Sequence, residues 1–433
     1  MRTKSKGELL RAIVQRRARV CILGLGYVGL HLAVRFKRAG FQVAGIDVDK
    51  QKIEKIKKGV AYVRELSASS STLRSIVATT GAEPLRDADV VIICVPTPLS
   101  KTRDPDISSV LEAGRVIARR LRRGQLIVME STTFPGTTRE LLLPLFEETG
   151  LKVGTDFFLA YSPERVDPGN RRFTLVNTPK VVAGITRSCS HLAQNLYSQI
   201  VKRVVPVSGT DMAEMVKLLE NIFRSVNIAL VNEFAIMCHR LGLNVWEAIS
   251  AAATKPYGFM PFYPGPGLGG HCIPVDPHYL SWKLRLLAYK ARFIDLADEV
   301  NREMPRFVVE KVAESLNRRR KSVNRSRILV LGVAYKKDSD DVRESPAIDI
   351  IKLLREGGAA ISYHDPYVAQ LAVDGQPLRS VPLSPRSLAS YDLVIVVTNH
   401  GRFDPRKIVK HSRLVIDTRN LTRGIASEKI VRL

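Results

Sequence analysis

The chain has 433 residues, of which 45% are apolar, and this is enough to form two or three domains with hydrophobic cores of their own. Its 67 lysines and arginines outnumber 42 aspartates and glutamates, which gives a formal net charge of +25. Such an excess indicates an anionic partner, whether a nucleic acid, a phosphorylated small molecule or a membrane surface. The composition excludes a disordered protein.

The sequence lacks the marks of membrane proteins, secreted proteins and structural zinc proteins. No run of about 18 uncharged apolar residues occurs, so we expect no membrane insertion. The basic N-terminus leads into a strand-like run without a small-residue cleavage site, which argues against a signal peptide. The five cysteines form no C-x-x-C pair, so we expect neither a disulfide framework nor a bound metal. We therefore predict a cytoplasmic protein with reduced thiols.

The N-terminal part alternates strand-like and helix-like segments. Residues 19–23 form a short apolar run that stops at Gly24, which is typical of a buried parallel strand before a tight turn. A helix is predicted over 28–39, and further strands are predicted at 41–49, 88–96, 125–132 and 156–164. This alternation predicts a parallel sheet in a first domain that spans residues 1–205.

The central part has helical periodicity. Apolar residues recur at steps of three and four over 211–253, which predicts a long central helix. Gly and Pro crowd residues 255–279, so we expect a functional loop there, followed by more helix up to Asn317. These segments form a second predicted domain, which spans residues 206–317.

A basic polar stretch at 317–327 precedes a return of the buried-strand pattern. Strands are predicted within the segments 327–335, 359–366, 392–400 and 413–420. A third domain would then span residues 318–433. The predicted fold class is α/β, with two Rossmann-like parallel-sheet domains joined by a long central helix.

A glycine-rich turn follows the first predicted strand and opens a helix, so its N–H groups could hold a pyrophosphate. Its residues are Gly24, Leu25, Gly26, Tyr27, Val28 and Gly29. Asp47 ends the second predicted strand, 18 residues after Gly29, where a carboxylate can bind ribose hydroxyls and repel a 2′-phosphate. The alternative is an ordinary turn with a surface aspartate, but strand, spacing and acid together favour NAD.

Two further sites carry candidate chemistry. Cys272 lies among glycines that clear side chains away from the thiol, and from the residues alone it is either a nucleophile or a small core residue. The adjacent His271 is assigned a structural role, because neighbours in an extended loop point apart. Lys217 and Asn221 lie four apart on one helix face, where they could address the same small group or simply face solvent.

The basic runs at 119–123 and 318–321 lack interleaved aromatic residues. We therefore interpret them as solvated faces rather than nucleic-acid sites. Cys21 and Cys94 lie in strand-like runs and Cys238 lies in a helix, so these three are interpreted as small core residues.

Taken in order, eight motifs resemble those of the nucleotide-sugar (UDP-glucose/GDP-mannose) 6-dehydrogenase family, whose NAD-dependent enzymes oxidise the sugar of a nucleotide sugar to the uronic acid. The motifs are GLGYVGL (24–30), Asp47, VPTPL (95–99), ESTTFPGTT (130–138), SPERVDPGN (162–170), Lys217 with Asn221, GPGLGGHCIPVDP (265–277) and GVAYKKDSDDVRESPA (332–347). They span nearly the whole chain, so a chance match is a poor explanation.

The resemblance implies a role for each domain: the first binds NAD, the central one builds a homodimer and carries the catalytic loop, and the last binds UDP. Cys272 matches the catalytic thiol, Lys217 and Asn221 the pair around the C6 oxygen, and Asp276 the water-activating carboxylate. Thr132 and Glu164 match polar residues near the reacting centre. The implied NAD-binding residues are Gly24, Gly26, Tyr27, Val28, Gly29, Asp47, Thr97 and Thr132. The implied substrate-binding residues are Glu164, Lys217, Asn221, Gly269, Lys336 and Arg343.

The chain departs from the family pattern at two positions. UDP-glucose enzymes tend to have Ser or Tyr before the cysteine and a second Glu four residues after that of SPE, whereas this chain has His271 and Pro168. Three loops look instead like the branch that acts on UDP-N-acetylhexosamines. UDP-N-acetylglucosamine is therefore the favoured substrate, with UDP-glucose and UDP-N-acetylmannosamine as alternatives.

The implied reaction is a four-electron oxidation of CH₂OH to carboxylate through a thiohemiacetal and a thioester on Cys272. Two other readings compete with it. A 3-hydroxy acid dehydrogenase also combines a Rossmann domain with Lys and Asn on a helix, but it has no use for Cys272 or a second α/β domain. A basic nucleic-acid-binding protein would show salt-steep binding and no NADH production.

Overall fold

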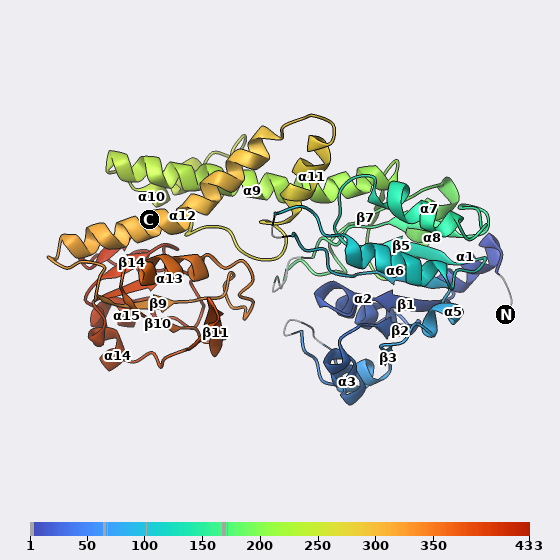
Figure 1. Cartoon of the computed structure of the whole chain (residues 1–433), viewed down its shortest axis with the longest axis horizontal. Coiled ribbons are helices and arrows are strands. Elements are labelled where there is room, and N and C mark those ends of the chain that lie inside the picture. Colours follow the sequence, from blue (N-terminus) through green and yellow to red (C-terminus); the bar gives the residue numbers. More distant parts are fainter. Residues whose placement is uncertain (1–3, 64–65, 67, 101, 167–169, 171) are drawn as a thin grey trace. The chain divides into compact units, whose positions relative to one another are not determined.

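The structure is a computed structural model that describes residues 4–63, 66, 68–100, 102–166, 170 and 172–433. The chain forms two compact units (Figure 1). The first contains residues 1–220 and 278–289, and the second contains residues 221–277 and 290–433.

The five strands predicted in the first unit are present with helices between them, whereas the strands at 77–79, 180–184 and 204–206 were not predicted. In chain order the elements of this unit are α1 (Lys6–Val14), β1 (Arg19–Leu23), α2 (Tyr27–Arg38), β2 (Gln42–Ile46), α3 (Lys50–Lys58), α4 (Ser70–Arg74), β3 (Val77–Thr79), α5 (Pro84–Asp87), β4 (Val90–Ile93), α6 (Ser108–Ala118), β5 (Leu126–Met129), the π-helix η1 (Thr137–Leu142), α7 (Leu143–Glu147), β6 (Phe158–Tyr161), β7 (Lys180–Gly184), α8 (Arg187–Ser198) and β8 (Val204–Pro206). Two helices, α9 (Thr210–Leu241) and α11 (Asp276–Arg285), contribute residues to both units.

The sheet of the first unit has the order β3-β2-β1-β4-β5-β6-β7-β8. Its strand order reverses between β1 and β4, and the carboxyl ends of strands at such a reversal are where nucleotides bind in open α/β sheets. The prediction of parallel pairing holds except between β6 and β7, which are antiparallel. Parallel neighbours need a crossover, and the described part of the segment 162–179 between these strands contains no helix that could provide one.

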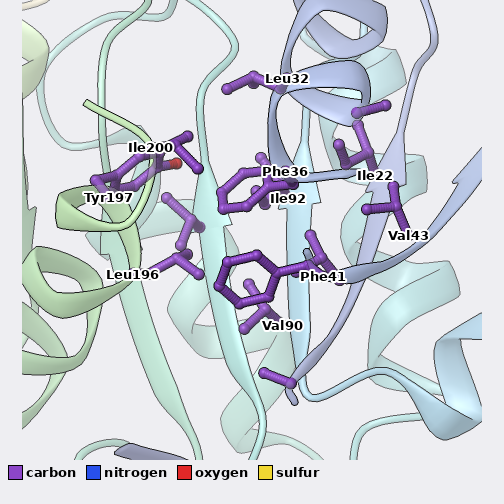
Figure 2. Packing of buried hydrophobic residues seen from close by; sticks show 14 of the residues in the cluster. Ile22, Leu32, Phe36, Phe41, Val43, Val90, Ile92, Leu196, Tyr197 and Ile200 are labelled. Carbon is purple, nitrogen blue, oxygen red and sulfur yellow. The ribbon is translucent and has the colours of Figure 1, made fainter. Parts of the chain in front are cut away.

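Side chains alternate between the two faces of this sheet, and each face is covered by helices. Val90 and Ile92 of β4 face a core that includes residues of α2 and α8, whereas Val91 and Ile93 face a core that includes residues of α6 and α7. Figure 2 shows the first core, in which Phe36 of α2 and Tyr197 of α8 pack over the strands. Both faces are therefore dry, and the chemistry is left to the ends of the strands.

The second unit contains a smaller parallel sheet with the order β10-β9-β13-β14-β15. Besides parts of α9 and α11, its elements are α10 (Val245–Ala252), α12 (Arg292–Asn317), β9 (Arg327–Leu331), α13 (Pro346–Glu356), β10 (Ala360–His364), β11 (Gln370–Val373), β12 (Gln376–Arg379), α14 (Pro385–Ser390), β13 (Leu393–Val396), α15 (Pro405–His411), β14 (Val415–Asp417) and β15 (Ile430–Arg432). The four predicted strands are present. The hairpin β11–β12 and the last strand β15 were not predicted.

The predicted helix over 211–253 is wrong at its C-terminal end. Helix α9 ends at Leu241, and Gly242 follows with a φ of +69°, a left-handed conformation that ends helices. The side chain of Asn244 then accepts hydrogen bonds from two N–H groups of α10 and starts a new helix. Apolar periodicity continues through this break, so the periodicity could not reveal the end of α9.

Among the described residues, no helix is long and apolar enough to cross a membrane.

Candidate active site

Each of the three glycines in the turn after β1 is suited to its position for a different physical reason. Gly24 has a φ of +88°, and a Cβ there would lie 2.4 Å from the carbonyl oxygen of Cys94. Gly26 is the N-cap of α2, where a Cβ would meet nothing within 4 Å and no side chain caps the helix. A Cβ on Gly29 would lie 1.8 Å from the carbonyl oxygen of Gly24. Tight turn, open approach and close packing are the three requirements of a pyrophosphate site at a helix N-terminus, so the turn fits NAD.

Asp47 directly follows β2 and is 7% exposed. One carboxylate oxygen accepts the N–H of Leu25 at 2.8 Å, and the other accepts the N–H of Asp49 at 2.9 Å. The ammonium of Lys52 lies 3.3 Å away. The carboxylate therefore ties the glycine-rich turn to the end of β2. Its other two contacts are the long hydrogen bonds from Lys52, at 3.4 and 3.3 Å, and these are the ones that a ribose hydroxyl would replace.

Replacing Asp47 by Ala is expected to narrow the preference for NAD⁺ over NADP⁺ by about tenfold, because a 2′-phosphate would no longer face a carboxylate. The measurement is kcat/KM for each cofactor. Asp47→Asn is the second variant, since it keeps one oxygen for the Leu25 N–H and removes the charge together with the oxygen that accepts the Asp49 N–H. An unchanged ratio in both variants would show that Asp47 does not discriminate between the cofactors.

Thr97 and Thr132 lie beyond the carboxyl ends of the next two strands, β4 and β5, at the same sheet edge as Gly24. The carbonyl of the buried Thr97 accepts the hydroxyl of Tyr279 at 2.8 Å. Thr132 is half-buried and follows Ser131, whose hydroxyl donates to the carbonyl of Val95 at 2.7 Å. Both threonines are thus held on fixed backbone beside the predicted dinucleotide site.

Glu164 and Lys217 meet through the backbone. The ammonium of Lys217 donates to the carbonyl oxygen of Glu164 at 2.7 Å. The Glu164 carboxylate accepts the N–H groups of Arg165 at 2.8 Å and Val166 at 2.6 Å. Burial acts to raise the pKa of Glu164, but the ammonium of Lys180, the Val166 N–H and the charge of Lys217 together hold that pKa below its ordinary value. Pro168 lies outside the described residues.

Three residues beside Glu164 were missed by sequence reasoning. Lys180 places its ammonium 2.8 Å from Glu130 and 3.3 Å from Glu164, and Glu130 also accepts the hydroxyl of Tyr197. Glu130 follows an apolar strand at the carboxyl edge of the sheet, and this position was the only signal that could have indicated it.

Glu214 of α9 was also missed. Its buried carboxylate accepts the N–H of Gly136 at 2.6 Å and both the N–H and the hydroxyl of Thr138, at 2.9 and 2.7 Å. These donors lie at the start of η1, directly after the segment that contains Thr132. Glu214 therefore fastens that segment to the helix that carries Lys217. Burial raises the pKa of Glu214 to about 7, although the three hydrogen bonds oppose the shift.

This raised pKa predicts a pH-dependent stability. The folded carboxyl keeps its proton up to about pH 7, whereas the unfolded one loses it near its ordinary pKa of 4.5. The group's contribution to stability is therefore complete below pH 4.5 and declines by about 3 kcal/mol as the pH rises to 7. Urea unfolding of wild type and Glu214→Gln between pH 4.5 and 8 measures this, and the difference between the two curves should vary with pH by that amount. Parallel curves would contradict the prediction.

Asn221, Asp276 and Cys272 are linked within the second unit. The Asn221 amide donates to the Asp276 carboxylate, and both side chains are buried. Asp276 begins α11, and its N–H donates to the carbonyl of Cys272 at 2.8 Å, as does that of Val275 at 3.1 Å. Cys272 is exposed, whereas Cys21, Cys189 and Cys238 are buried and Cys94 is half-buried. The backbone of Cys272 is thus held in the turn before α11, a helix whose first residue is the predicted water-activating carboxylate.

The glycines before Cys272 serve a different purpose from the one predicted. A Cβ on Gly269 or Gly270 would lie 2.6 or 2.7 Å from the side chain of Tyr335, so these positions lack a side chain because the loop packs closely on that residue. The N–H of Gly270 also donates to the carbonyl of Arg343 at 3.0 Å. The cysteine loop is therefore fastened to the segment that carries Lys336 and Arg343.

Lys336 and Arg343 lie in the segment that follows β9. Lys336 is half-buried, and the exposed Arg343 forms an ion pair with Asp341 at 2.6 Å. Burial acts to raise the pKa of Asp341, but hydrogen bonds from Arg343 and the nearby charges of Arg343 and His271 hold it below its ordinary value. The charge of His271 thus acts on Asp341, and the structural role of His271 stays a prediction.

Models of three domains from one protein family match successive parts of the chain. The NAD binding domain of the UDP-glucose/GDP-mannose dehydrogenase family matches residues 18–201, the central domain of that family matches residues 211–303, and its UDP binding domain matches residues 329–424.

Individual relatives cover almost the whole length. A UDP-N-acetyl-D-mannosamine dehydrogenase of Pyrococcus horikoshii is 37% identical over 93% of this chain and 96% of its own length. A UDP-N-acetyl-D-glucosamine 6-dehydrogenase of Pseudomonas aeruginosa is 33% identical over 93% and 97%. A solved structure of UDP-D-ManNAc dehydrogenase from Pyrococcus horikoshii superposes with a TM-score of 0.87 at 36% identity, covering 96% of this chain and 98% of the other.

Proposed function

The chain belongs to the UDP-glucose/GDP-mannose dehydrogenase family and is an NAD-dependent UDP-sugar dehydrogenase, and from this we propose that it oxidises C6 of a UDP-N-acetylhexosamine to the uronic acid. The observation that carries the proposal is the link between Asn221, Asp276 and Cys272. An exposed cysteine whose carbonyl is bonded to the N–H of a residue with a buried, oriented carboxylate suits the formation and hydrolysis of a thioester.

In the proposed mechanism NAD⁺ accepts the hydrides, two in sequence for each sugar. The Cys272 thiol adds to the C6 aldehyde, and the resulting thiohemiacetal again carries a C–H bond. Loss of its hydride leaves a thioester, and water then releases the acid and restores the thiol. Asp276 would take the proton of that water, and the Asn221 amide fixes the orientation of its carboxylate.

Lys217 would stabilise the negative charge that develops on the C6 oxygen. Its ammonium has three N–H donors, and one of them is used by the Glu164 carbonyl. That hydrogen bond fixes the direction of the side chain. Glu164 and Thr132 are proposed to contact the sugar, while Gly269, Lys336 and Arg343 are proposed to contact the nucleotide part of the substrate.

UDP-N-acetylglucosamine is the substrate that we propose first, on the basis of His271, Pro168 and the three loop motifs. UDP-N-acetylmannosamine is the second candidate, because relatives of similar identity carry either name. The two sugars differ only in configuration at C2. Comparing kcat/KM from NADH formation with these two substrates and with UDP-glucose tests the proposal. A clear preference for UDP-glucose would overturn the N-acetylhexosamine assignment and leave the family unchanged.

We propose that the protein is a homodimer whose interface is formed by α9. One face of this helix exposes large apolar side chains at steps of three, four and seven residues, which places them in a single stripe. They are Leu219, Phe223, Leu230, Phe234, Met237 and Leu241. Six exposed apolar residues on one helix face are unusual for a monomer, and a second copy of the same helix would cover them.

Phe234→Glu is expected to convert the dimer to a monomer, because it places a charge in the middle of this stripe. Sedimentation velocity measures the mass. Phe173→Glu is the matched control, since Phe173 is similarly exposed in the first unit, and it should remain dimeric. If Phe234→Glu sediments as wild type does, α9 is not the dimer interface.

A further inference from the structure

A buried lysine at the start of β7 has no role in the mechanism described so far. Lys180 is 3% exposed, and its ammonium lies 2.8 Å from Glu130, 3.3 Å from Glu164 and 3.2 Å from the carbonyl oxygen of Pro163. An ammonium has three donors, and these three acceptors use all of them. A buried charge of this kind is stable only when it is paired and hydrogen-bonded, so the geometry around Lys180 is tightly determined.

The inner side of this arrangement is anchored in the core. Glu130 is buried, and its second oxygen accepts the hydroxyl of Tyr197. Tyr197 is itself fully buried, and its ring lies among the apolar side chains of Figure 2. Lys180 and Glu130 are 50 residues apart in sequence; Lys180 begins β7 and Glu130 directly follows β5, and only β6 separates these two strands in the sheet. The position of the ammonium is therefore set by the core and not by solvent.

The outer side of the arrangement reaches the proposed catalytic residues. Lys180 holds the segment 163–164 at two points, the Pro163 carbonyl and the Glu164 carboxylate. The next carbonyl, that of Glu164, accepts the ammonium of Lys217 at 2.7 Å. A movement of this segment would move both the Glu164 carboxylate and the acceptor that orients Lys217.

We propose that Lys180 is a positioning residue for the oxidation: paired with Glu130 inside the domain, it keeps Glu164 as an anion and holds the peptide group that orients Lys217. This inference rests on the proposed function, because Glu164 and Lys217 receive their roles there. Lys180 itself touches no reacting atom in this scheme.

The charges agree with this role. Burial acts to raise the pKa of both carboxyls, and the charge of Lys180 opposes the shift at each. The net shift differs between the two carboxyls. The pKa of Glu164 lies below its ordinary value, whereas the pKa of Glu130 lies above its ordinary value. The titratable groups that face Glu164 are Lys180, Lys217, Glu130, Tyr197 and Cys94, and the last two also face Glu130. Lys180 is thus the main counter-charge of Glu164.

The test removes the ammonium without leaving Glu130 as an unpaired buried charge. Lys180→Met alone would do that, so the decisive variant is Lys180→Met combined with Glu130→Gln, which keeps an oxygen for Tyr197 and leaves Lys217 as the remaining counter-charge of Glu164. Its kcat is expected to fall by about tenfold or more with affinity for NAD⁺ within about twofold of wild type. Because loss of the cation raises the pKa of Glu164, the acidic limb of its kcat profile should move to higher pH.

Two further variants separate positioning from simple loss of structure. Lys180→Arg keeps the cation, so its acidic limb should stay at the wild-type pH and its kcat should fall less than that of the double variant. Lys311→Met is the matched control, because Lys311 is also a buried lysine but lies on α12 in the second unit. It should change stability and leave kcat and its pH profile as they are.

The results discriminate between this inference and the proposed function. If wild type oxidises none of the UDP-sugars, the proposed function fails. If wild type is active and the double variant has a wild-type kcat and pH profile, Lys180 serves only to neutralise Glu130 and the inference fails alone. An acidic limb that moves in Lys180→Arg as far as in the double variant would also overturn it.

Discussion

Replacing Cys272 by Ala is expected to abolish formation of the uronic acid while NAD⁺ and UDP-sugar still bind. An alcohol can lose one hydride without a covalent bond to the enzyme, but a bound aldehyde must become an sp³ adduct before a second hydride can leave. Only this later step needs sulfur. The substitution keeps the carbonyl of Cys272, which accepts the N–H groups of Val275 and Asp276 in the turn before α11.

The measurement is mass analysis of the products formed by Cys272→Ala with excess NAD⁺, together with a trial of the C6 aldehyde supplied from outside. No acid should form in either case. Cys238→Ala is the control, since this thiol is buried on α9 and its loss should cost about 1 kcal/mol of stability without affecting turnover. Acid formed at near the wild-type rate would show that a hydrated aldehyde gives the second hydride, and the thioester mechanism would be wrong.

The sequence predicted the fold where a local pattern determines the structure. The apolar run that stops at Gly24 coincides with β1, and the strand order places Gly24 and Asp47 at the carboxyl ends of adjacent strands. The strands at the middle of the two parallel sheets are buried along nearly their whole length, so β1, β4, β5, β9 and β13 appear as apolar runs. This is why the α/β class was predictable from periodicity without any resemblance.

Features that depend on contacts distant in sequence were not predictable. A lysine before an apolar run is read as a solvent-exposed strand end, yet Lys180 is buried because Glu130, 50 residues earlier, supplies a counter-charge. Glu214 lies within the predicted central helix, but its partners Gly136 and Thr138 lie 78 and 76 residues away. No local period carries such pairings, and an acidic or basic residue in isolation favours the exposed interpretation.

The candidate site also combines a feature that a local pattern predicts with features that depend on contacts distant in sequence. Helical spacing placed Lys217 and Asn221 on one face of α9, and this follows from geometry alone. The hydrogen bond from Asn221 to Asp276 spans 55 residues, and only the resemblance to a family placed those two residues in one reaction. The glycines near Cys272 were interpreted as space for a substrate, whereas the close approach of Tyr335 already requires them.

Lys217→Ala is expected to lower kcat by about a hundredfold or more and to change KM for the UDP-sugar by only a few-fold. An ammonium beside an oxygen that becomes negative interacts more strongly with the transition state than with the neutral alcohol, so its loss falls mainly on kcat. The structure supports this role, because the buried ammonium is already oriented by the Glu164 carbonyl before any substrate arrives. Steady-state kinetics with saturating NAD⁺ separates kcat from KM.

Lys57→Ala is the matched control, because Lys57 forms only an exposed ion pair with Glu54 on α3 and its removal should leave both constants unchanged. Gln or Met at position 217 should lower kcat as much as Ala does, since neither side chain carries a charge. Arg should recover part of kcat only if its wider guanidinium can still reach the Glu164 carbonyl. A result in which KM rises and kcat does not fall would assign Lys217 to the binding of a phosphate or a sugar hydroxyl. The stabilisation of the developing oxyanion would then have to come from another donor, and the Asn221 amide, one helical turn away and already committed to Asp276, would be the next group to test.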